Sequence, residues 1–331
     1  MGSGGAPARE AAPAGGDRAG RAFRLTETPG ATPYRQVWRA VPTDATRTLA
    51  GCHRTGDGPS VPAVLWLECA AEAALALLPG PVVALSGVRF PRGPLPLPPD
   101  RAPALWVGVW PPARPGSRSP AAVRVAIGTA PPGRDFPGTA ARELIAEATV
   151  HIGPLPPAPA PLPLPRRPAL PSRDPAREPG GPILLSGPFT ALTGVRRHSW
   201  GGSGEFTPGD GAAVAAGLLL PVLAVDCLLR MESQPPLSRG FLLPVYAPLR
   251  LALVEFFTPY DDRALGGLPV VLLHTPVSAP GTGVLNATGP GHRPVLRITG
   301  AANRLLGRFD ARARRWEVPG GGRRHPSKSP G

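Results

Sequence analysis

Residues 52–78 read CHRTGDGPSVPAVLWLECAAEAALALL, and this stretch decides the fold. It begins with a glycine-rich turn that carries His53 and continues as an apolar run that starts at Pro62. Proline is favoured at the first position of a helix, and a Pro-Gly pair directly after the run is a typical helix stop. We therefore predict a helix over 62–78. Because apolar residues occur all round it, we expect this helix to be buried on all sides.

The turn before this helix is suited to proton transfer. The imidazole of His53 lies next to backbone N–H groups that can polarise a carbonyl oxygen, and its ordinary pKa keeps it mostly neutral near pH 7. Removal of a proton next to a thioester needs such a combination. Taken alone, His53 could equally be an ordinary turn histidine.

The second half of the chain supplies a candidate acid. Residues 218–230 form an apolar segment in which Asp226 is the single acidic residue. We expect this segment to belong to one buried helix over 212–229, and burial would raise the pKa of the Asp226 carboxyl. The alternative is an exposed aspartate paired with Arg230 four residues later.

These segments resemble two motifs of the polyketide and fatty acid synthase dehydratases. His53 and Pro62 are in register with the family's His-x-x-x-Gly-x-x-x-x-Pro motif, and Asp226 matches the aspartate of its Asp-x-x-x-Gln/His motif. Asp57 replaces the glycine of the first motif, and Arg230 replaces the glutamine or histidine of the second. Two weaker matches, a Gly-Pro turn at 186–189 and a Leu-Pro segment at 242–251, occur in the same order along the chain as in the family.

The resemblance implies an α+β double hotdog fold in a discrete chain. Such a fold has two tandem units, each a curved antiparallel sheet wrapped around a long apolar helix. Alternating apolar residues predict the strands of both units, and a run of Pro-x-Pro predicts a spacer between them. The expected organisation is a disordered leader at 1–22, a first unit at 23–153, a Pro-rich linker at 154–181, a second unit at 182–316 and a disordered basic tail at 317–331.

The activity implied by the resemblance is that of a hydro-lyase. It would remove water from a 3-hydroxyacyl thioester, with His53 as the base and Asp226 as the acid, in polyketide or related biosynthesis. No metal or cofactor is expected, because the substrate would be carried on the phosphopantetheine of an acyl carrier protein. Acyl carrier protein and polyketide synthase components are the expected partners, and a homodimer is possible. The expected substrate-binding residues are Gly56, Asp57, Gly58, Pro62 and Arg230.

The two departures from the family motifs keep other functions open. Asp57 adds a side chain where close approach to substrate is expected, and the cation of Arg230 would lower the pKa of the acid. A catalytically weak dehydratase-like protein that binds polyketides is therefore one alternative. A hotdog thioesterase is another, although hydrolysis does not need an acid from the second unit.

Composition excludes several other classes. The net charge of +14 comes almost entirely from arginines spread along the chain, without the interleaved aromatics of a base-stacking surface, so we expect solvated charge and no nucleic-acid partner. The three cysteines are far apart and predict neither disulfides nor zinc. Charged residues and proline interrupt both long apolar runs, so we expect no membrane span, and no signal sequence is visible. The expected localisation is cytoplasmic.

Overall fold

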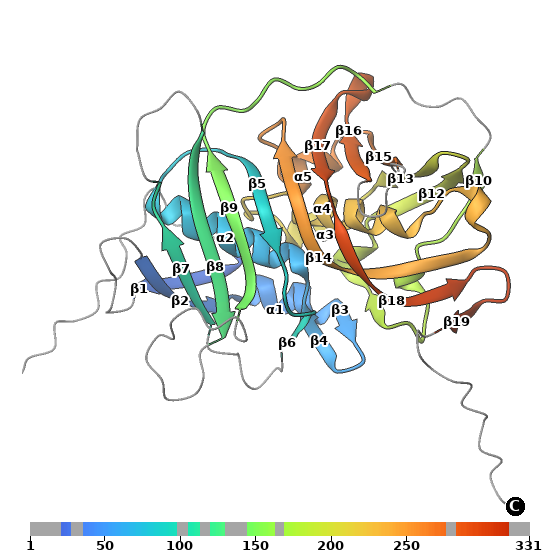
Figure 1. The fold of residues 1–331 in the computed structure, drawn as a ribbon, viewed down its shortest axis with the longest axis horizontal. Coiled ribbons are helices and arrows are strands. Elements are labelled where there is room, and N and C mark those ends of the chain that lie inside the picture. The colour runs from blue at the N-terminus through green and yellow to red at the C-terminus, as the bar shows by residue number, and fades with distance from the viewer. Residues whose placement is uncertain are drawn as a thin grey trace, which may run out of the picture.

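The computed structural model shows an α+β molecule in which two curved antiparallel sheets each surround a helix and join edge to edge (Figure 1). This arrangement is the double hotdog expected from the sequence. The structure describes residues 21–27, 36–97, 105–112, 120–129, 144–162, 169–275 and 283–317.

The first unit wraps its strands around helix α2 (Ala63–Leu77). The order of its strands across the sheet is β1-β2-β7-β8-β9-β5, with each neighbouring pair antiparallel. A short helix, α1 (Asp44–Gly51), and a small sheet that includes β3, β4 and β6 lie at one end. The strands are β1 (Phe23–Glu27), β2 (Gln36–Pro42), β3 (His53–Thr55), β4 (Gly58–Val61), β5 (Val82–Arg89), β6 (Leu95–Pro96), β7 (Leu105–Trp110), β8 (Ala121–Thr129) and β9 (Leu144–Ile152).

The second unit surrounds helix α4 (Val222–Arg230) in the same way. Its strand order is β14-β17-β16-β15-β13-β12-β10, again antiparallel throughout. Two further short helices are α3 (Gly211–Val214) and α5 (Asp262–Gly266). The strands are β10 (Leu170–Pro171), β11 (Ile183–Leu185), β12 (Leu192–His198), β13 (Gly201–Phe206), β14 (Leu242–Phe256), β15 (Val270–Thr275), β16 (Val284–Thr288), β17 (Pro294–Thr299), β18 (Ala302–Asp310) and β19 (Arg315–Glu317).

The two units share one continuous sheet. Strand β5 of the first unit pairs antiparallel with β14 of the second, with Leu85 opposite Val254 and Ser86 opposite Leu253. Strand β11 of the second unit also pairs with β3, so that Leu185 lies opposite His53. These two junctions fix the units against each other, and the α2 and α4 helices contact across them.

Helix α2 has the bounds and burial that the sequence predicts. Pro62 precedes it with an extended backbone, and every residue from Val64 to Ala74 is buried. This all-round burial explains the absence of a polar face, because the helix packs against β7, β8 and β9 on one side and α4 on another.

The second predicted helix is interrupted, so the expectation of one helix over 212–229 is wrong. Helix α3 ends at Val214, and α4 begins only at Val222. Gly217 between them has a φ of +93°, a conformation that breaks a right-handed helix. Pro221 then serves as the N-cap of α4, since its ring permits a helix start but not a helix interior.

The predicted linker is only partly a spacer. Within 154–181, β10 pairs with β12 at the edge of the large sheet, a position that tolerates proline. A 3₁₀ helix, η1 (Pro175–Arg177), follows and buries Pro175 and Ala176 against the second unit. The segment thus contributes a strand, a 3₁₀ helix and several buried side chains to the folded part of the chain.

The two ends of the chain differ slightly from the expected bounds. Ala22, predicted to be part of the leader, is buried and donates its N–H to Glu72 at 2.6 Å. Glu317, predicted to be part of the tail, belongs to β19. Residues 1–20 and 318–331 lie outside the described residues. Near the C-terminal end, the arginine-containing strand β18 pairs with β14. This strand was not predicted.

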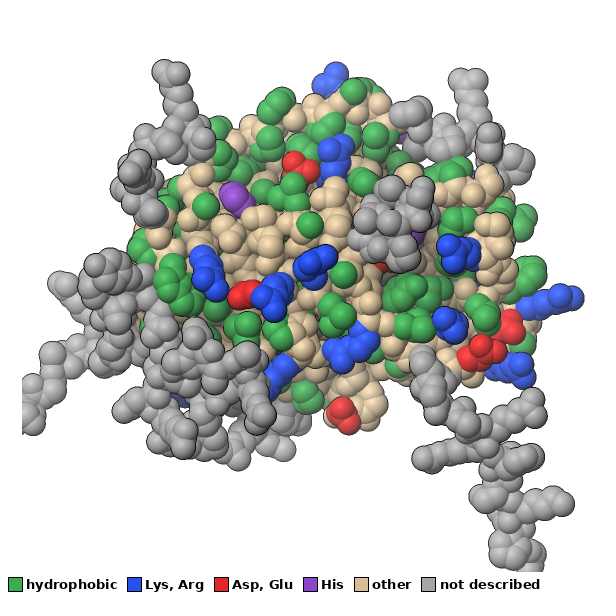
Figure 2. Space-filling view, viewed as in Figure 1, with side chains coloured by type: hydrophobic (Ala, Val, Ile, Leu, Met, Phe, Trp, Pro, Cys, Tyr) green, Lys and Arg blue, Asp and Glu red, His purple; other side chains and the backbone are tan. Residues whose placement is uncertain are grey.

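Arginines are spread over the face seen in Figure 2 among apolar and neutral side chains. The spacing fits the expectation of solvated charge, and the absence of a nucleic-acid partner stays a prediction. Within the described ranges, no helix is both long and apolar enough to cross a membrane.

A buried carboxylate links the two units. Glu68 on α2 is fully buried, and its two oxygens accept the N–H groups of Leu219 and Leu220 at 2.6 and 2.9 Å. The bonds hold the segment that leads into α4.

Glu68→Ala is expected to lower the free energy of unfolding by about 2–4 kcal/mol, because it leaves two N–H groups without their acceptor. Denaturation in urea measures the loss. The control is Glu147→Ala, which removes a carboxylate paired with the exposed Arg89 and should cost at most about 1 kcal/mol. Equal losses in the two variants would contradict a structural role for Glu68.

Candidate active site

A cavity lies at the junction of the two units. It is open to solvent at its mouth and contains about 850 Å³ of atom-free space, part of which is solvent at the mouth. Both units contribute to its wall. The lining residues are His53, Val61, Ala63, Val64, Trp66, Phe90, Arg92, Gly93, Pro94, Ile145, Ala176, Ile183, Leu185, Asp226, Leu229, Arg230, Ser233, Val245, Tyr246, Ala247, Pro248 and Asn303.

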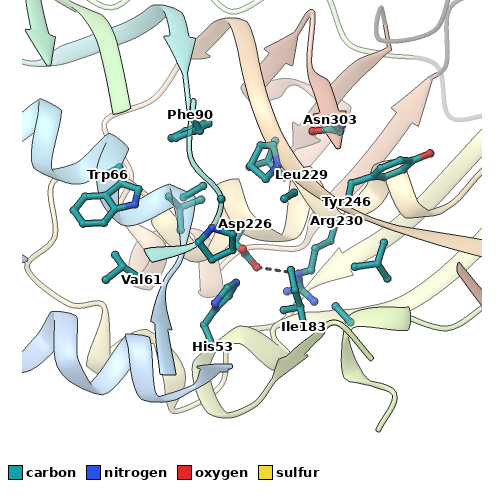
Figure 3. Close-up of a pocket in the computed structure, with 18 of the residues that line it drawn as sticks. His53, Val61, Trp66, Phe90, Ile183, Asp226, Leu229, Arg230, Tyr246 and Asn303 are labelled. Atoms are coloured by element: carbon teal, nitrogen blue, oxygen red, sulfur yellow. Dashed lines mark hydrogen bonds and ion pairs between the residues drawn. The ribbon is translucent and has the colours of Figure 1, made fainter. Parts of the chain in front are cut away.

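His53 and Asp226 meet in this cavity although 173 residues separate them in the sequence. His53 is the first residue of β3 in the first unit, and Asp226 lies in the middle of α4 in the second. Figure 3 shows the imidazole and the carboxyl pointing toward each other, with Val61 and Trp66 on one side and Arg230 on the other. The cavity therefore brings an imidazole and a carboxyl within reach of one bound molecule.

The surroundings of His53 fix its tautomer. Its Nδ1 lies 2.8 Å from the hydroxyl of Ser60, and that hydroxyl donates its single proton to the carbonyl oxygen of His53 at 3.2 Å. When the hydroxyl is engaged in this way, Nδ1 carries the ring proton and donates it to Ser60. The other ring nitrogen, Nε2, is left with a free lone pair, which a general base requires.

His53 is also held in its neutral form. It is 6% exposed, and burial lowers the pKa of its imidazole from 6.5 to about 4, with a further lowering from the charge of Arg230. The ring of Phe189 packs edge-on against it, with the centroids 6.0 Å apart. Near pH 7 the base is ready to accept a proton.

Asp226 has one engaged and one free oxygen. Its Oδ2 accepts the Nε–H of Arg230 at 2.9 Å, whereas Oδ1 has no hydrogen-bond partner among the described residues. Burial raises the pKa of the Asp226 carboxyl, and the charge of Arg230 opposes this rise. The carboxyl remains easier to protonate than an ordinary aspartate.

Arg230 is buried in the site. The alternative interpretation of the sequence, in which Asp226 is exposed and pairs with Arg230 at the surface, is wrong. The Arg230 side chain is 10% exposed and uses all parts of the guanidinium. The Nε–H binds Asp226, one terminal nitrogen forms an ion pair with Asp174, and the other donates to the carbonyl oxygen of Phe189 at 2.8 Å. Burial acts to lower the pKa of the Arg230 guanidinium, but the charges of Asp174 and Asp226 outweigh burial and hold this pKa above its ordinary value.

The predicted binding residues of the first motif do not all reach the cavity. Gly56 and Asp57 form the exposed turn between β3 and β4, and Gly58 follows with a φ of +104°. None of the three lines the cavity, so the structure does not place the side chain of Asp57 at the cavity wall, and the predicted role of the three residues in substrate binding stays a prediction. The hairpin carries His53 at its base and directs its tip away from the site.

Pro62 acts through the helix that it starts. The next two residues, Ala63 and Val64, line the cavity, and the first N–H groups of a helix have no partner within it. The N-terminus of α2 is thus the part of the first motif that can offer hydrogen bonds to a bound oxygen.

Asp174 forms an ion pair with Arg230 and was not predicted as a site residue from the sequence. Asp174 precedes Pro175, and its Oδ1 accepts the N–H of Ala176 at 3.1 Å, which caps η1. An aspartate directly before a proline is a typical helix start, and this signal could have identified a structured turn within the Pro-rich segment.

Comparison with solved structures shows which proteins share this fold. It is the double hotdog of the dehydratase domains of polyketide synthases, and the matched regions cover most of both chains. No model of a known protein family matches this sequence, and no curated protein matches it. The similarity therefore lies in the structure.

Particular solved structures illustrate it. The dehydratase domain from the CurF module of curacin polyketide synthase has a TM-score of 0.66 and 13% identity, over 84% of this chain and 97% of that one. The bifunctional dehydratase–cyclase domain in ambruticin biosynthesis has a TM-score of 0.58 and 16% identity, over 85% and 94%. A dehydratase of a mycocerosic acid synthase-like polyketide synthase has a TM-score of 0.59 and 14% identity, over 88% and 96%.

Two further matches are variants of the CurK dehydratase. Both are described as inactive, one with a histidine replaced by phenylalanine and the other with an aspartate replaced by asparagine. Their TM-scores are 0.62 and 0.58, at 12% and 13% identity, over 86% of this chain and 96% of the first variant and over 84% and 94% for the second.

Proposed function

We propose that this protein is a dehydratase of 3-hydroxyacyl thioesters carried on an acyl carrier protein. The observation that carries the proposal is the convergence of His53 and Asp226, from separate units, on one cavity. The residue types agree with those whose loss inactivates the CurK dehydratase. Polyketide synthase components would be its partners, a homodimer its assembly and the cytoplasm its location.

The chemistry follows from the protonation states. Nε2 of neutral His53 takes the proton from C2 of the acyl chain, and the C3–O bond breaks. The leaving hydroxyl receives the proton of the Asp226 carboxyl and departs as water. The 2,3-unsaturated thioester remains, with an imidazolium and a carboxylate that return to their starting states by proton exchange with solvent.

The negative charge that develops on the thioester oxygen needs a hydrogen-bond donor. The N-terminus of α2, at Ala63 and Val64, is the donor that the cavity offers, and the positive end of the helix dipole favours an anion there. The apolar wall of Trp66, Phe90 and Ile145 would hold the acyl chain and exclude water from the reacting carbons.

Incubation of the protein with a 3-hydroxyacyl pantetheine thioester, followed by mass spectrometry, tests this proposal. Loss of one water from the intact thioester supports it. An unchanged thioester that nevertheless binds would identify a dehydratase-like polyketide-binding protein, and release of the free acid would identify a thioesterase. Either result would overturn the proposed activity.

A further inference from the structure

We propose that Asp174, from the Pro-rich segment between the units, is a tuning residue that offsets the charge of Arg230 and so keeps Asp226 able to hold a proton. This inference rests on the proposed function for its catalytic meaning, but the protonation of Asp226 can be measured without any substrate. Asp174 does not line the cavity and is not a catalytic residue.

The guanidinium of Arg230 is shared between two carboxyls, Asp226 at 2.9 Å and Asp174, and both pairs are mostly buried, with side-chain exposures of 13% and 3% for the acids. Asp174 is used on both oxygens, because one binds Arg230 and the other accepts the N–H of Ala176. Among the described residues, Asp226 uses one oxygen, Oδ2, which accepts the hydrogen bond of Arg230.

With both acids ionised, the three side chains carry a net negative charge, whereas protonation of one acid makes the group neutral. An uncompensated charge is costly away from water, so the buried group favours one proton. That proton belongs on Asp226, because its free oxygen faces the cavity whereas both oxygens of Asp174 already accept hydrogen bonds from N–H groups.

Asp174 offsets the effect of Arg230, the residue that departs from the family motif. An arginine alone at this position would pair with Asp226 and lower the pKa of that carboxyl. A second carboxylate on the same guanidinium raises it again, and the two opposing influences on Asp226 are both present in this site. The presence of Arg230 therefore does not imply that the protein is catalytically weak.

Other titratable groups surround Asp226 and must be considered. On its own helix these are Arg230 and Cys227, and Asp262 on α5 is close enough to interact with it. His53 faces it across the cavity, and Glu68 and Glu232 lie on elements that pack against α4. Burial raises the pKa values of Asp262, Glu68 and Glu232 to about 7, so the signal of Asp226 must be assigned individually.

Carbon-13 NMR of the full protein, labelled at the aspartate side-chain carboxyls, provides that assignment in the absence of substrate. The resonance that disappears in Asp226→Asn belongs to Asp226. We expect it to titrate above the ordinary range in the wild-type protein. In Asp174→Asn its pKa should fall by about 1–3 units, because Arg230 is left with Asp226 as its single charged partner.

The double variant Asp174→Asn/Arg230→Gln is a second test if Asp174→Asn folds poorly, since it replaces the buried ion pair by two neutral side chains that still carry hydrogen-bond donors and acceptors. Its Asp226 should again titrate above the ordinary range. The control is Glu178→Gln, which removes a carboxylate from the more exposed pair with Arg173 on the same segment and should leave the Asp226 titration unchanged.

An Asp226 carboxyl that titrates in the ordinary range in the wild type, or that is unaffected by Asp174→Asn, would overturn the inference. A double variant whose Asp226 pKa stays below the ordinary range would overturn it as well. If Asp226 titrates as expected but the protein does not dehydrate the thioester, the inference stands and the proposed activity fails. If dehydration occurs, the alkaline limit of kcat/KM should move to lower pH in Asp174→Asn, in parallel with the NMR titration.

Discussion

His53→Phe is expected to lower kcat for dehydration by about 10²–10⁴-fold, the usual contribution of a positioned general base. Phenylalanine has a similar planar shape but offers no lone pair in place of Nε2. The loss should leave KM almost unchanged, because the variant keeps the apolar wall and the N-terminus of α2 that would bind the substrate. Steady-state kinetics with the 3-hydroxyacyl pantetheine thioester measure both constants.

The pH profile of the wild-type protein provides a second readout for His53. The pKa of its imidazole is lowered to about 4, so the neutral base is present at neutral pH and is lost only as the pH falls through about 4. The acid limit of kcat/KM should therefore lie near pH 4. The control is His151→Gln, since His151 is bonded to Ser86 outside the cavity; a comparable loss of activity in this variant would contradict a specific role for His53.

Asp226→Asn is expected to lower kcat by about 10²–10³-fold, because the amide cannot give an acidic proton to the leaving hydroxyl. The amide oxygen can still accept the hydrogen bond of Arg230, so the fold should be retained. Exchange of the C2 hydrogen with deuterium from solvent separates the two roles. Exchange should persist in Asp226→Asn, where His53 is intact, and should disappear in His53→Phe.

Asp210→Asn is the matched control for this substitution, because Asp210 is exposed and remote from the cavity lining. It should retain full activity. If C2 exchange were lost equally in Asp226→Asn and His53→Phe, the assignment of base and acid would be wrong.

The sequence predicts the parts of the fold that local patterns control. The apolar run after Pro62 becomes α2 with almost the predicted bounds, and alternating residues near Val107 and Val125 become β7 and β8. The break before α4 was missed because Gly217 and Pro221 lie within a long apolar run, whose composition resembles that of a continuous buried helix. Strand β18 was missed because its arginines suggested solvated charge, although its backbone pairs with β14.

The candidate site divides in a similar way. Motif spacing is sufficient to select His53 and Asp226, but nothing local requires the two residues to meet, since the β5–β14 pairing brings their units together. The same spacing assigned Gly56 and Asp57 to substrate binding, whereas the β3–β4 hairpin carries them away from the cavity. The contact of Asp174 with Arg230 was not predicted, because the prolines around Asp174 indicated a spacer.

The central claim is that His53 and Asp226 act together on one substrate molecule, and the double variant His53→Phe/Asp226→Asn tests it most directly. Groups that work as a unit give strongly non-additive losses. We therefore predict that kcat of the double variant is about equal to the kcat of the less active of the two single variants. A loss equal to the product of the two single losses would show that the residues act independently and would contradict the account.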